Sequence, residues 1–179
     1  MKPFGTFMAL CGLLIAIPLA AAGAAPLETV PELDVSRYVG VWHQIAHFPN
    51  RFQAHCVGDT TAEYSLLKDG RLRVHNRCRR ADGTFDEALG VARRNAAYDR
   101  PGILQVRFAP AWLSFLSRVW GDYWILALED DYSAVLIGTP DREYLWILAR
   151  TPTLPEPVRA KFRGLAVDAG FDWSRVVDR

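Results

Sequence analysis

The segment most informative about the fold runs from Leu33 to Trp42 and reads Leu-Asp-Val-Ser-Arg-Tyr-Val-Gly-Val-Trp. Its end opens a run of apolar and aromatic residues, from Val41 to Phe48, that stops at Pro49-Asn50. A short run of this kind, ended by turn-forming residues, predicts a strand. Gly40 precedes the strand and has no Cβ, so the entering chain can approach a neighbour closely.

Further segments of the same kind follow along the chain, with short turns between them. The turn Lys68-Asp69-Gly70 is a hairpin signal, and such close spacing favours an antiparallel meander over β-α-β units. Eight strands can close into a barrel that holds one small ligand and leaves no strand edge unpaired. The remaining predicted strands span residues 60–67, 72–78, 84–97, 103–108, 123–128, 134–138 and 144–149.

The pattern changes after Arg150. Residues 151–155 form a proline-rich connector, and Pro155 suits the first turn of a helix. Apolar residues then recur at helical spacing until Gly170, a natural stop: Val158, Phe162, Leu165, Ala166 and Ala169. The predicted fold class is therefore all-β, an eight-stranded antiparallel up-and-down barrel with one C-terminal α-helix packed outside. A short ninth strand is expected within residues 171–177.

The first 25 residues have the layout of a secretory signal peptide. Lys2 gives a positive start, and an apolar stretch at 7–22 ends in small residues. This stretch is short for a membrane span, and Gly12 and Pro18 interrupt it. The sequence therefore predicts a cleaved signal peptide at 1–25 and one exported domain at 26–179, with a membrane anchor as the alternative.

The charge of the predicted domain is balanced. Without Lys2, the chain keeps 20 of its 21 basic residues against 20 acidic ones. No basic stripe indicates a nucleic-acid partner, and the small arginine clusters at 77–80 and 93–94 are interpreted as solvated strand ends.

The predicted domain keeps two cysteines, Cys56 and Cys78. An even number of cysteines in an exported domain favours a disulfide. The two residues flank predicted strands joined by the turn at 68–70, so they approach each other across a hairpin. A free reactive thiol is the competing interpretation.

Three segments in order resemble the conserved regions of the lipocalin family. The first is Leu33 to Trp42 with its Gly-x-Trp, the second is Asp131-Tyr132, and the third is Tyr144 to Arg150. Asp130 stands where the second region normally has threonine. The resemblance covers about Asp34 to Val177 and is nearest to bacterial outer-membrane lipocalins and apolipoprotein D. It implies a barrel that carries a small hydrophobic ligand.

Gly40, Trp42 and Arg150 are assigned a structural role within this fold. Trp42 can plug the closed end of the barrel. Arg150 can stack on its indole and donate hydrogen bonds to carbonyls of the N-terminal turn.

Catalytic and metal sites are not expected. The four histidines lack metal-ligand spacing, and neither a Gly-x-Ser-x-Gly elbow nor a phosphate-binding glycine loop occurs. His43 and His47, four residues apart on a strand, would lie about 13 Å from each other. No cofactor is implied.

The ligand would occupy the barrel interior, where alternate residues of each strand point inward. Fixing the phase on Trp42 and Trp146 predicts a lining of apolar, small and a few polar side chains, which suits amphipathic ligands. The candidate ligand-binding residues are Gln44, Ala46, Ala62, Tyr64, Val74, Asn76, Ala88, Gly90, Leu104, Val106, Phe108, Tyr123, Ile125, Ala134, Leu136 and Trp146.

The predicted function is non-catalytic binding and transport of fatty acids, lysophospholipids or similar lipids in the periplasm, in association with the outer membrane. Cys11 fits a lipidation site poorly, because Leu10 stands where a small residue is expected and an apolar run continues beyond it. One alternative is a lipocalin-fold enzyme that uses a pocket cysteine or tyrosine. Another is a membrane-contacting or homodimer-forming module that uses the large apolar residues of 112–120. Two further interpretations of residues 108–121 stay open, namely a lid over the barrel mouth and a loop folded back on the core.

Overall fold

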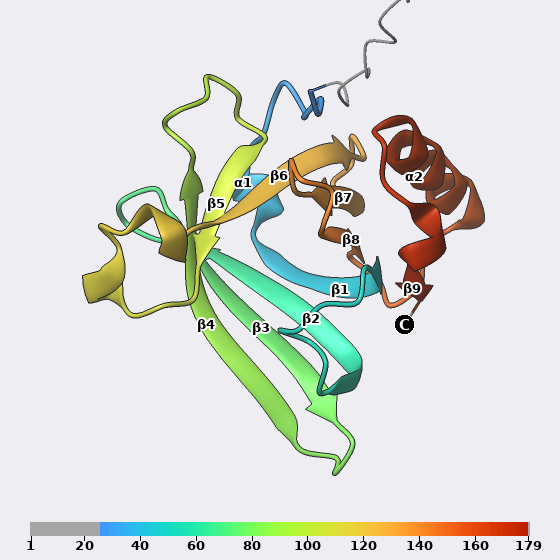
Figure 1. Ribbon diagram of the computed structural model, residues 1–179, viewed down its shortest axis with the longest axis horizontal. Coiled ribbons are helices and arrows are strands. Elements are labelled where there is room, and N and C mark those ends of the chain that lie inside the picture. Colours follow the sequence, from blue (N-terminus) through green and yellow to red (C-terminus); the bar gives the residue numbers. More distant parts are fainter. Residues whose placement is uncertain (1–25, 179) are drawn as a thin grey trace, which may run out of the picture.

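The computed structural model describes residues 26–178, so the predicted signal peptide and Cys11 lie outside the described residues. Within this range the strands form one antiparallel sheet in the order β2-β3-β4-β5-β6-β7-β8-β1-β9 (Figure 1). An additional pairing between β1 and β2 closes the first eight into a barrel. The predicted up-and-down barrel is confirmed.

The strands follow the alternating segments of the sequence closely. Several begin or end a few residues away from the predicted bounds, and β2 begins four residues before the predicted Thr60. Their bounds are β1 Gly40–His47, β2 Cys56–Leu66, β3 Leu72–Arg80, β4 Phe85–Arg94, β5 Ile103–Arg107, β6 Gly121–Leu128, β7 Ala134–Gly138, β8 Leu145–Ala149 and β9 Val177–Asp178.

The ninth strand starts later than predicted. A 3-10 helix, η3 (Trp173–Arg175), occupies the centre of the segment expected to be extended. Asp172 causes this, because its side chain accepts a hydrogen bond from the backbone amide of Ser174 at 3.1 Å. Of this segment, only the two residues of β9 pair with β1, at Ala46 and His47.

The barrel has one closed and one open end. The short helix α1 (Val35–Tyr38) precedes β1 at the closed end, and Asp34 caps it. Since β1 runs away from α1 and successive strands alternate in direction, the open end carries the connections 48–55, 81–84, 108–120 and 139–144.

The height of the barrel wall differs around its circumference. β1 pairs with β2 only through residues 40–43, whereas β2 pairs with β3 from Leu66 to Cys56. Likewise β4 pairs with β5 only through residues 91–94. The outer parts of β2, β3 and β4 therefore extend past the other strands as a three-stranded projection (Figure 1).

Two apolar cores hold the fold together. One fills the base of the barrel around Trp42, Val135 and Ile137, which are fully buried. The other lies between the barrel wall and α2 (Glu156–Asp168), where Phe162 and Ala166 are fully buried. The predicted external helix is confirmed. No helix among residues 26–178 has both the length and the apolar character needed to cross a membrane.

Candidate ligand-binding site

A cavity of about 750 Å³ lies inside the barrel and reaches the loops of the open end. This volume suits one small lipid or similar ligand. Ten of the sixteen residues predicted to line the barrel interior surround it: Gln44, Ala62, Tyr64, Val74, Asn76, Ala88, Val106, Phe108, Tyr123 and Trp146.

Three predicted lining residues face the other way, toward α2: Ala46, Ala134 and Leu136. A register shift between Gln44 and Ala46 in the pairing of β1 with β8 breaks the inward-outward alternation. On β7 both faces are apolar, because one faces the barrel interior and the other faces the helix. Val135 and Ile137 are the residues that point inward there. The inward orientation predicted for these three residues was therefore wrong.

Three further predicted residues lie inside the barrel but do not line the cavity: Gly90, Leu104 and Ile125. Leu104 and Ile125 are packed in the core at the base. Gly90 is covered by Phe108, since a Cβ there would come within 2.8 Å of the Phe108 ring. Glycine is what allows this close contact.

Trp42 and Arg150 seal the closed end. The Trp42 indole donates to the carbonyl of Tyr38 at 2.9 Å, and the Arg150 guanidinium stacks on its ring at 3.9 Å. The same guanidinium donates to the carbonyls of Arg37 at 2.7 Å and Val41 at 3.1 Å. Gly40 adopts φ +96°, and a Cβ there would lie 3.3 Å from the guanidinium. This geometry agrees with the structural role expected of the three residues.

Three tyrosine hydroxyls meet at the base of the cavity. The Tyr123 hydroxyl lies 2.7 Å from that of Tyr38 and 2.9 Å from that of Tyr64. Burial raises the pKa of Tyr64 to about 12 and the pKa values of Tyr38 and Tyr123 well above their ordinary value. The cluster is therefore neutral at physiological pH and offers hydroxyl groups instead of a charge.

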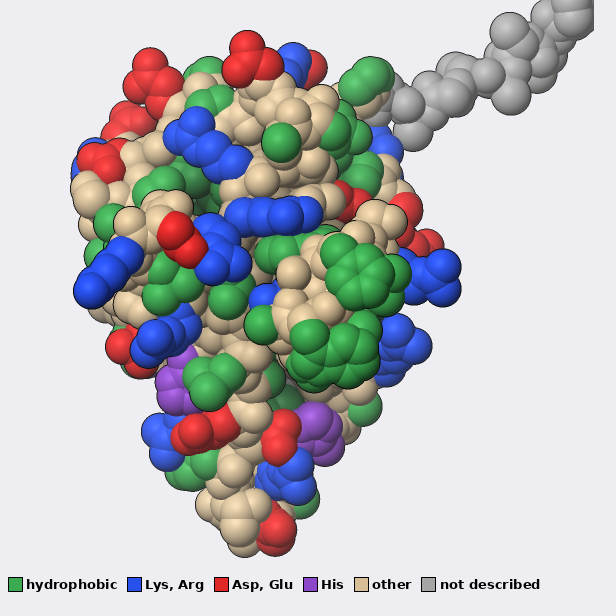
Figure 2. All heavy atoms as spheres, turned by 90° about the vertical axis from the view of Figure 1, so that its left-hand side faces the viewer, with side chains coloured by type: hydrophobic (Ala, Val, Ile, Leu, Met, Phe, Trp, Pro, Cys, Tyr) green, Lys and Arg blue, Asp and Glu red, His purple; other side chains and the backbone are tan. Residues whose placement is uncertain are grey.

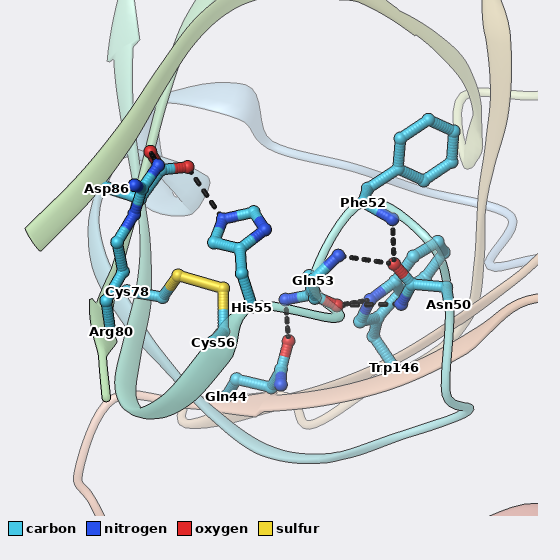
Figure 3. Close-up of a disulfide and its surroundings, with 10 residues drawn as sticks. All are labelled: Gln44, Asn50, Phe52, Gln53, His55, Cys56, Cys78, Arg80, Asp86 and Trp146. Atoms are coloured by element: carbon cyan, nitrogen blue, oxygen red, sulfur yellow. Dashed lines mark hydrogen bonds and ion pairs between the residues drawn. A yellow bond between two sulfur atoms is a disulfide. The ribbon is translucent and has the colours of Figure 1, made fainter. Parts of the chain in front are cut away.

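The β1–β2 loop, residues 48–55, folds over the open end and supplies a polar residue that strand alternation could not predict. Gln53 points from this loop to the barrel wall, between Gln44 and Trp146 (Figure 3). Its side chain donates to Gln44 Oε1 at 2.7 Å and accepts from Trp146 Nε1 at 3.2 Å. The loop is thus attached to two predicted lining residues by side-chain hydrogen bonds.

A disulfide joins Cys56 of β2 to Cys78 of β3, as predicted. Beside it, His55 lies 2.8 Å from Asp86, which also receives a hydrogen bond from Arg80 (Figure 3). These two hydrogen bonds hold the pKa of Asp86 below its ordinary value. His55 and the two cysteines bring three metal-ligating atoms within 4.8 Å, but both sulfurs are bonded to each other.

The β5–β6 connection, residues 108–120, combines packed and exposed aromatic side chains. Trp120 is buried and stacks under Arg93 at 3.7 Å. Trp112 and Phe115 are 73% and 77% exposed. Figure 2 shows hydrophobic side chains gathered on this face of the molecule, with basic side chains around them. The predicted contact patch therefore reduces to the outer part of the loop.

The sequence of nearly the whole described domain matches a known family. A family model described as a lipocalin-like domain covers residues 33–179. The chain belongs to the lipocalin family. The sealed base, the closed barrel and the external helix are thus the features of a lipocalin.

Curated relatives extend this result to most of the chain. Temperature-induced lipocalin-1 of Arabidopsis thaliana is 38% identical over 151 residues, covering 84% of this lipocalin and 80% of the relative. The outer membrane lipoprotein Blc of Escherichia coli K12 is 36% identical over 152 residues, covering 84% and 81%. Apolipoprotein D of Rattus norvegicus is 33% identical over 165 residues, covering 88% and 82%.

A solved structure shows the same fold at low sequence identity. Insecticyanin from the tobacco hornworm Manduca sexta matches with a TM-score of 0.67 and 20% identity, over 88% of this lipocalin and 85% of that chain. The barrel fold is therefore shared at a sequence identity of 20%.

Proposed function

We propose that this lipocalin is a non-catalytic carrier of a small hydrophobic ligand, of the size and character of a fatty acid, a lysophospholipid or a similar lipid. The observation that carries the proposal is the cavity of about 750 Å³, which is sealed at one end by Trp42 and Arg150. Its wall is mainly apolar, and burial of an acyl chain there contributes about 0.8 kcal/mol per CH₂ group. The ten residues on the wall are the proposed ligand contacts.

The arrangement of the reactive side chains supports a binding role over a catalytic one. The disulfide removes the thiol that an enzyme acting through Cys56 would need. The raised pKa values of Tyr38, Tyr64 and Tyr123 make these hydroxyls poor bases and poor nucleophiles. The same side chains are well suited to orient a ligand.

The cellular setting is part of the proposal. The predicted signal peptide and the disulfide favour an exported protein. The similarity to an outer membrane lipoprotein of Escherichia coli favours a place in the bacterial envelope. Lipid transfer or envelope maintenance is the role that fits this setting.

The direct test is titration of the disulfide-bonded protein with a fluorescent fatty acid. We expect saturable binding that Trp146→Ala weakens, because the Trp146 indole forms part of the cavity wall. The matched control is Trp173→Ala, which removes an indole outside the barrel, near α2. No saturable binding by the wild type, or equal binding by both variants, would contradict the proposal.

A second proposed role is contact with a membrane through Trp112 and Phe115. Both side chains are largely exposed on a loop of the open end, and the exposed Arg118 follows in the same loop. Exposed aromatic residues next to basic ones suit the interface of an anionic bilayer. Sedimentation with anionic liposomes should carry down the wild type and leave a Trp112→Ser, Phe115→Ser double variant in solution. Concentration-dependent dimerisation without liposome binding would instead assign the patch to a homodimer.

A further inference from the structure

We propose that the Gln44 side-chain amide donates a hydrogen bond to a carbonyl oxygen of the bound lipid. The cavity would then prefer ligands that place a neutral ketone or ester carbonyl at this depth over matched hydrocarbons and over carboxylates. This inference rests on the proposed function, since it assumes that a lipid occupies the cavity.

The direction of the hydrogen bonds around Gln44 is set by two fixed groups. An indole N–H can only donate, so the atom of Gln53 that faces Trp146 Nε1 at 3.2 Å must be its oxygen. The contacts of Asn50 lead to the same orientation of the Gln53 amide. Its oxygen accepts from the backbone amides of Phe52 and Gln53, both at 3.1 Å, which leaves its NH₂ group to donate to Gln53 Oε1 at 2.8 Å.

These constraints determine how Gln44 is oriented. With its oxygen turned to Trp146 and Asn50, Gln53 must present its NH₂ group to Gln44, at 2.7 Å. Gln44 therefore turns its own oxygen toward Gln53 and keeps its NH₂ group for another partner. The assignment does not depend on telling nitrogen from oxygen in the Gln44 amide itself.

The remaining NH₂ group of Gln44 is buried without a hydrogen-bond partner among residues 26–178. Gln44 as a whole is 7% exposed and lines the cavity. A buried donor without an acceptor costs about 1–3 kcal/mol, so such groups nearly always have a partner in the functional state. The cavity is where the missing acceptor can lie.

The surroundings of Gln44 select a neutral acceptor. Gln44 is two residues nearer the open end than Trp42, which places it about 7 Å along the strand from the plug. Most charged residues that line the cavity come from the open-end loops or from the open-end parts of β4 and β6. Arg77 of β3 is the exception, since it pairs with Thr61, which pairs with His43 next to Gln44. Its guanidinium is already engaged, because it stacks on Phe85 at 3.5 Å and lies 3.7 Å from Glu87. A carboxylate next to Gln44 would lose its hydration without gaining a counter-ion, whereas a carbonyl oxygen would not carry that cost.

The test compares two ligands of the same shape. One is undecyl methyl ketone, and the other is the hydrocarbon isostere in which C=CH₂ replaces C=O. Each competes with a fluorescent fatty acid for the wild type, for Gln44→Met and for the control Gln105→Met, an outward-facing glutamine of β5. We expect Gln44→Met to weaken ketone binding about three- to tenfold. Binding of the hydrocarbon isostere should change less than twofold, and Gln105→Met should change neither.

Infrared spectroscopy of the bound ketone gives a second measurement, and its first part uses the wild type alone. In the wild type, the carbonyl stretch should lie below its frequency in a hydrocarbon solvent, and Gln44→Met should return it to that frequency. An unshifted stretch in the wild type, or a shift that persists in Gln44→Met, would overturn the inference. If the wild type shows no saturable binding of the fluorescent fatty acid, the proposed function fails instead, whereas a bound probe that the ketone does not displace overturns this inference alone.

Discussion

Replacing Arg150 with alanine should destabilise the fold by about 3 kcal/mol while leaving the ligand site intact. The guanidinium makes two short hydrogen bonds, to the carbonyls of Arg37 at 2.7 Å and Val41 at 3.1 Å. At this partly exposed position each contributes about 1 kcal/mol. Stacking on the Trp42 ring at 3.9 Å adds about 1 kcal/mol. A third hydrogen bond, to Tyr132 at 3.3 Å, is long and adds little.

The assay is urea unfolding of the disulfide-bonded protein followed by tryptophan fluorescence, with the free energy of unfolding extrapolated to water. Arg150→Lys should lose about 2 kcal/mol, because an ammonium group cannot reach both carbonyls and stack on the indole together. The control Arg94→Ala removes an exposed arginine at the end of β4 and should change stability by less than about 0.5 kcal/mol.

Two results would contradict the structural role of Arg150. One is a loss below about 1 kcal/mol in Arg150→Ala, which would mean that water replaces the guanidinium at little cost. The other is a large loss of ligand affinity in a folded Arg150→Ala protein under native conditions. That would place Arg150 in the binding site instead of the seal.

Three other predictions concern the disulfide, the first glycine and the tyrosines. A Cys56→Ser, Cys78→Ser double variant should lower the free energy of unfolding by about 3 kcal/mol on the loop-entropy model, since the two cysteines are 22 residues apart in the sequence. Thiol titration of the unfolded, unreduced wild type should find no free thiol from this pair. Gly40→Ala should lower the free energy of unfolding by about 1–2 kcal/mol more than a change at an ordinary surface position, because φ is +96° and the new methyl group meets Arg150. The control is Gly70→Ala, at φ +81° with open space around it, which measures the cost of the backbone conformation alone. Burial raises the pKa of Tyr64 from 10.0 to about 12, so the unfolded chain loses this proton first as pH rises. The contribution of Tyr64 to the free energy of unfolding should therefore be constant below pH 10 and fall between about pH 10 and 12. Tyr64→Phe should reduce that fall, and an identical fall in the variant would exclude Tyr64 as its cause.

The sequence predicted the barrel well because alternation and turn residues are local signals. All eight strands and the external helix lie within a few residues of the expected positions. The role of Arg150 came from the resemblance to the family together with the chemistry of a guanidinium next to an indole. Nothing in these elements depends on knowing the tertiary contacts in advance.

The lining residues were harder to predict for two physical reasons. A bulge after Gln44 reverses the phase of β1 without any local mark in the sequence, since Ile45 and Ala46 are both apolar. On β7 every residue is buried, because α2 covers the outer face, and so alternation carries no information about which side is the cavity.

Gln53 shows a different limit of sequence reasoning. It lies in a loop, where periodicity assigns no direction to a side chain, and its partners Gln44 and Trp146 are 9 and 93 residues away. Only the folded loop shows that three polar groups form one connected set.

The attachment of Gln53 to a loop, instead of a strand, also has a kinetic consequence. A ligand enters through the open end, because the other end of the barrel is sealed, and residues 48–55 lie over that end. If that loop opens to admit the ligand, Gln53 no longer orients the Gln44 amide, and the amide then discriminates little between molecules with and without an acceptor. Once the loop returns, the amide is fixed as a donor and holds the molecules that can accept from it. Preferred lipids should therefore dissociate more slowly than rejected ones, whereas both should associate at similar rates.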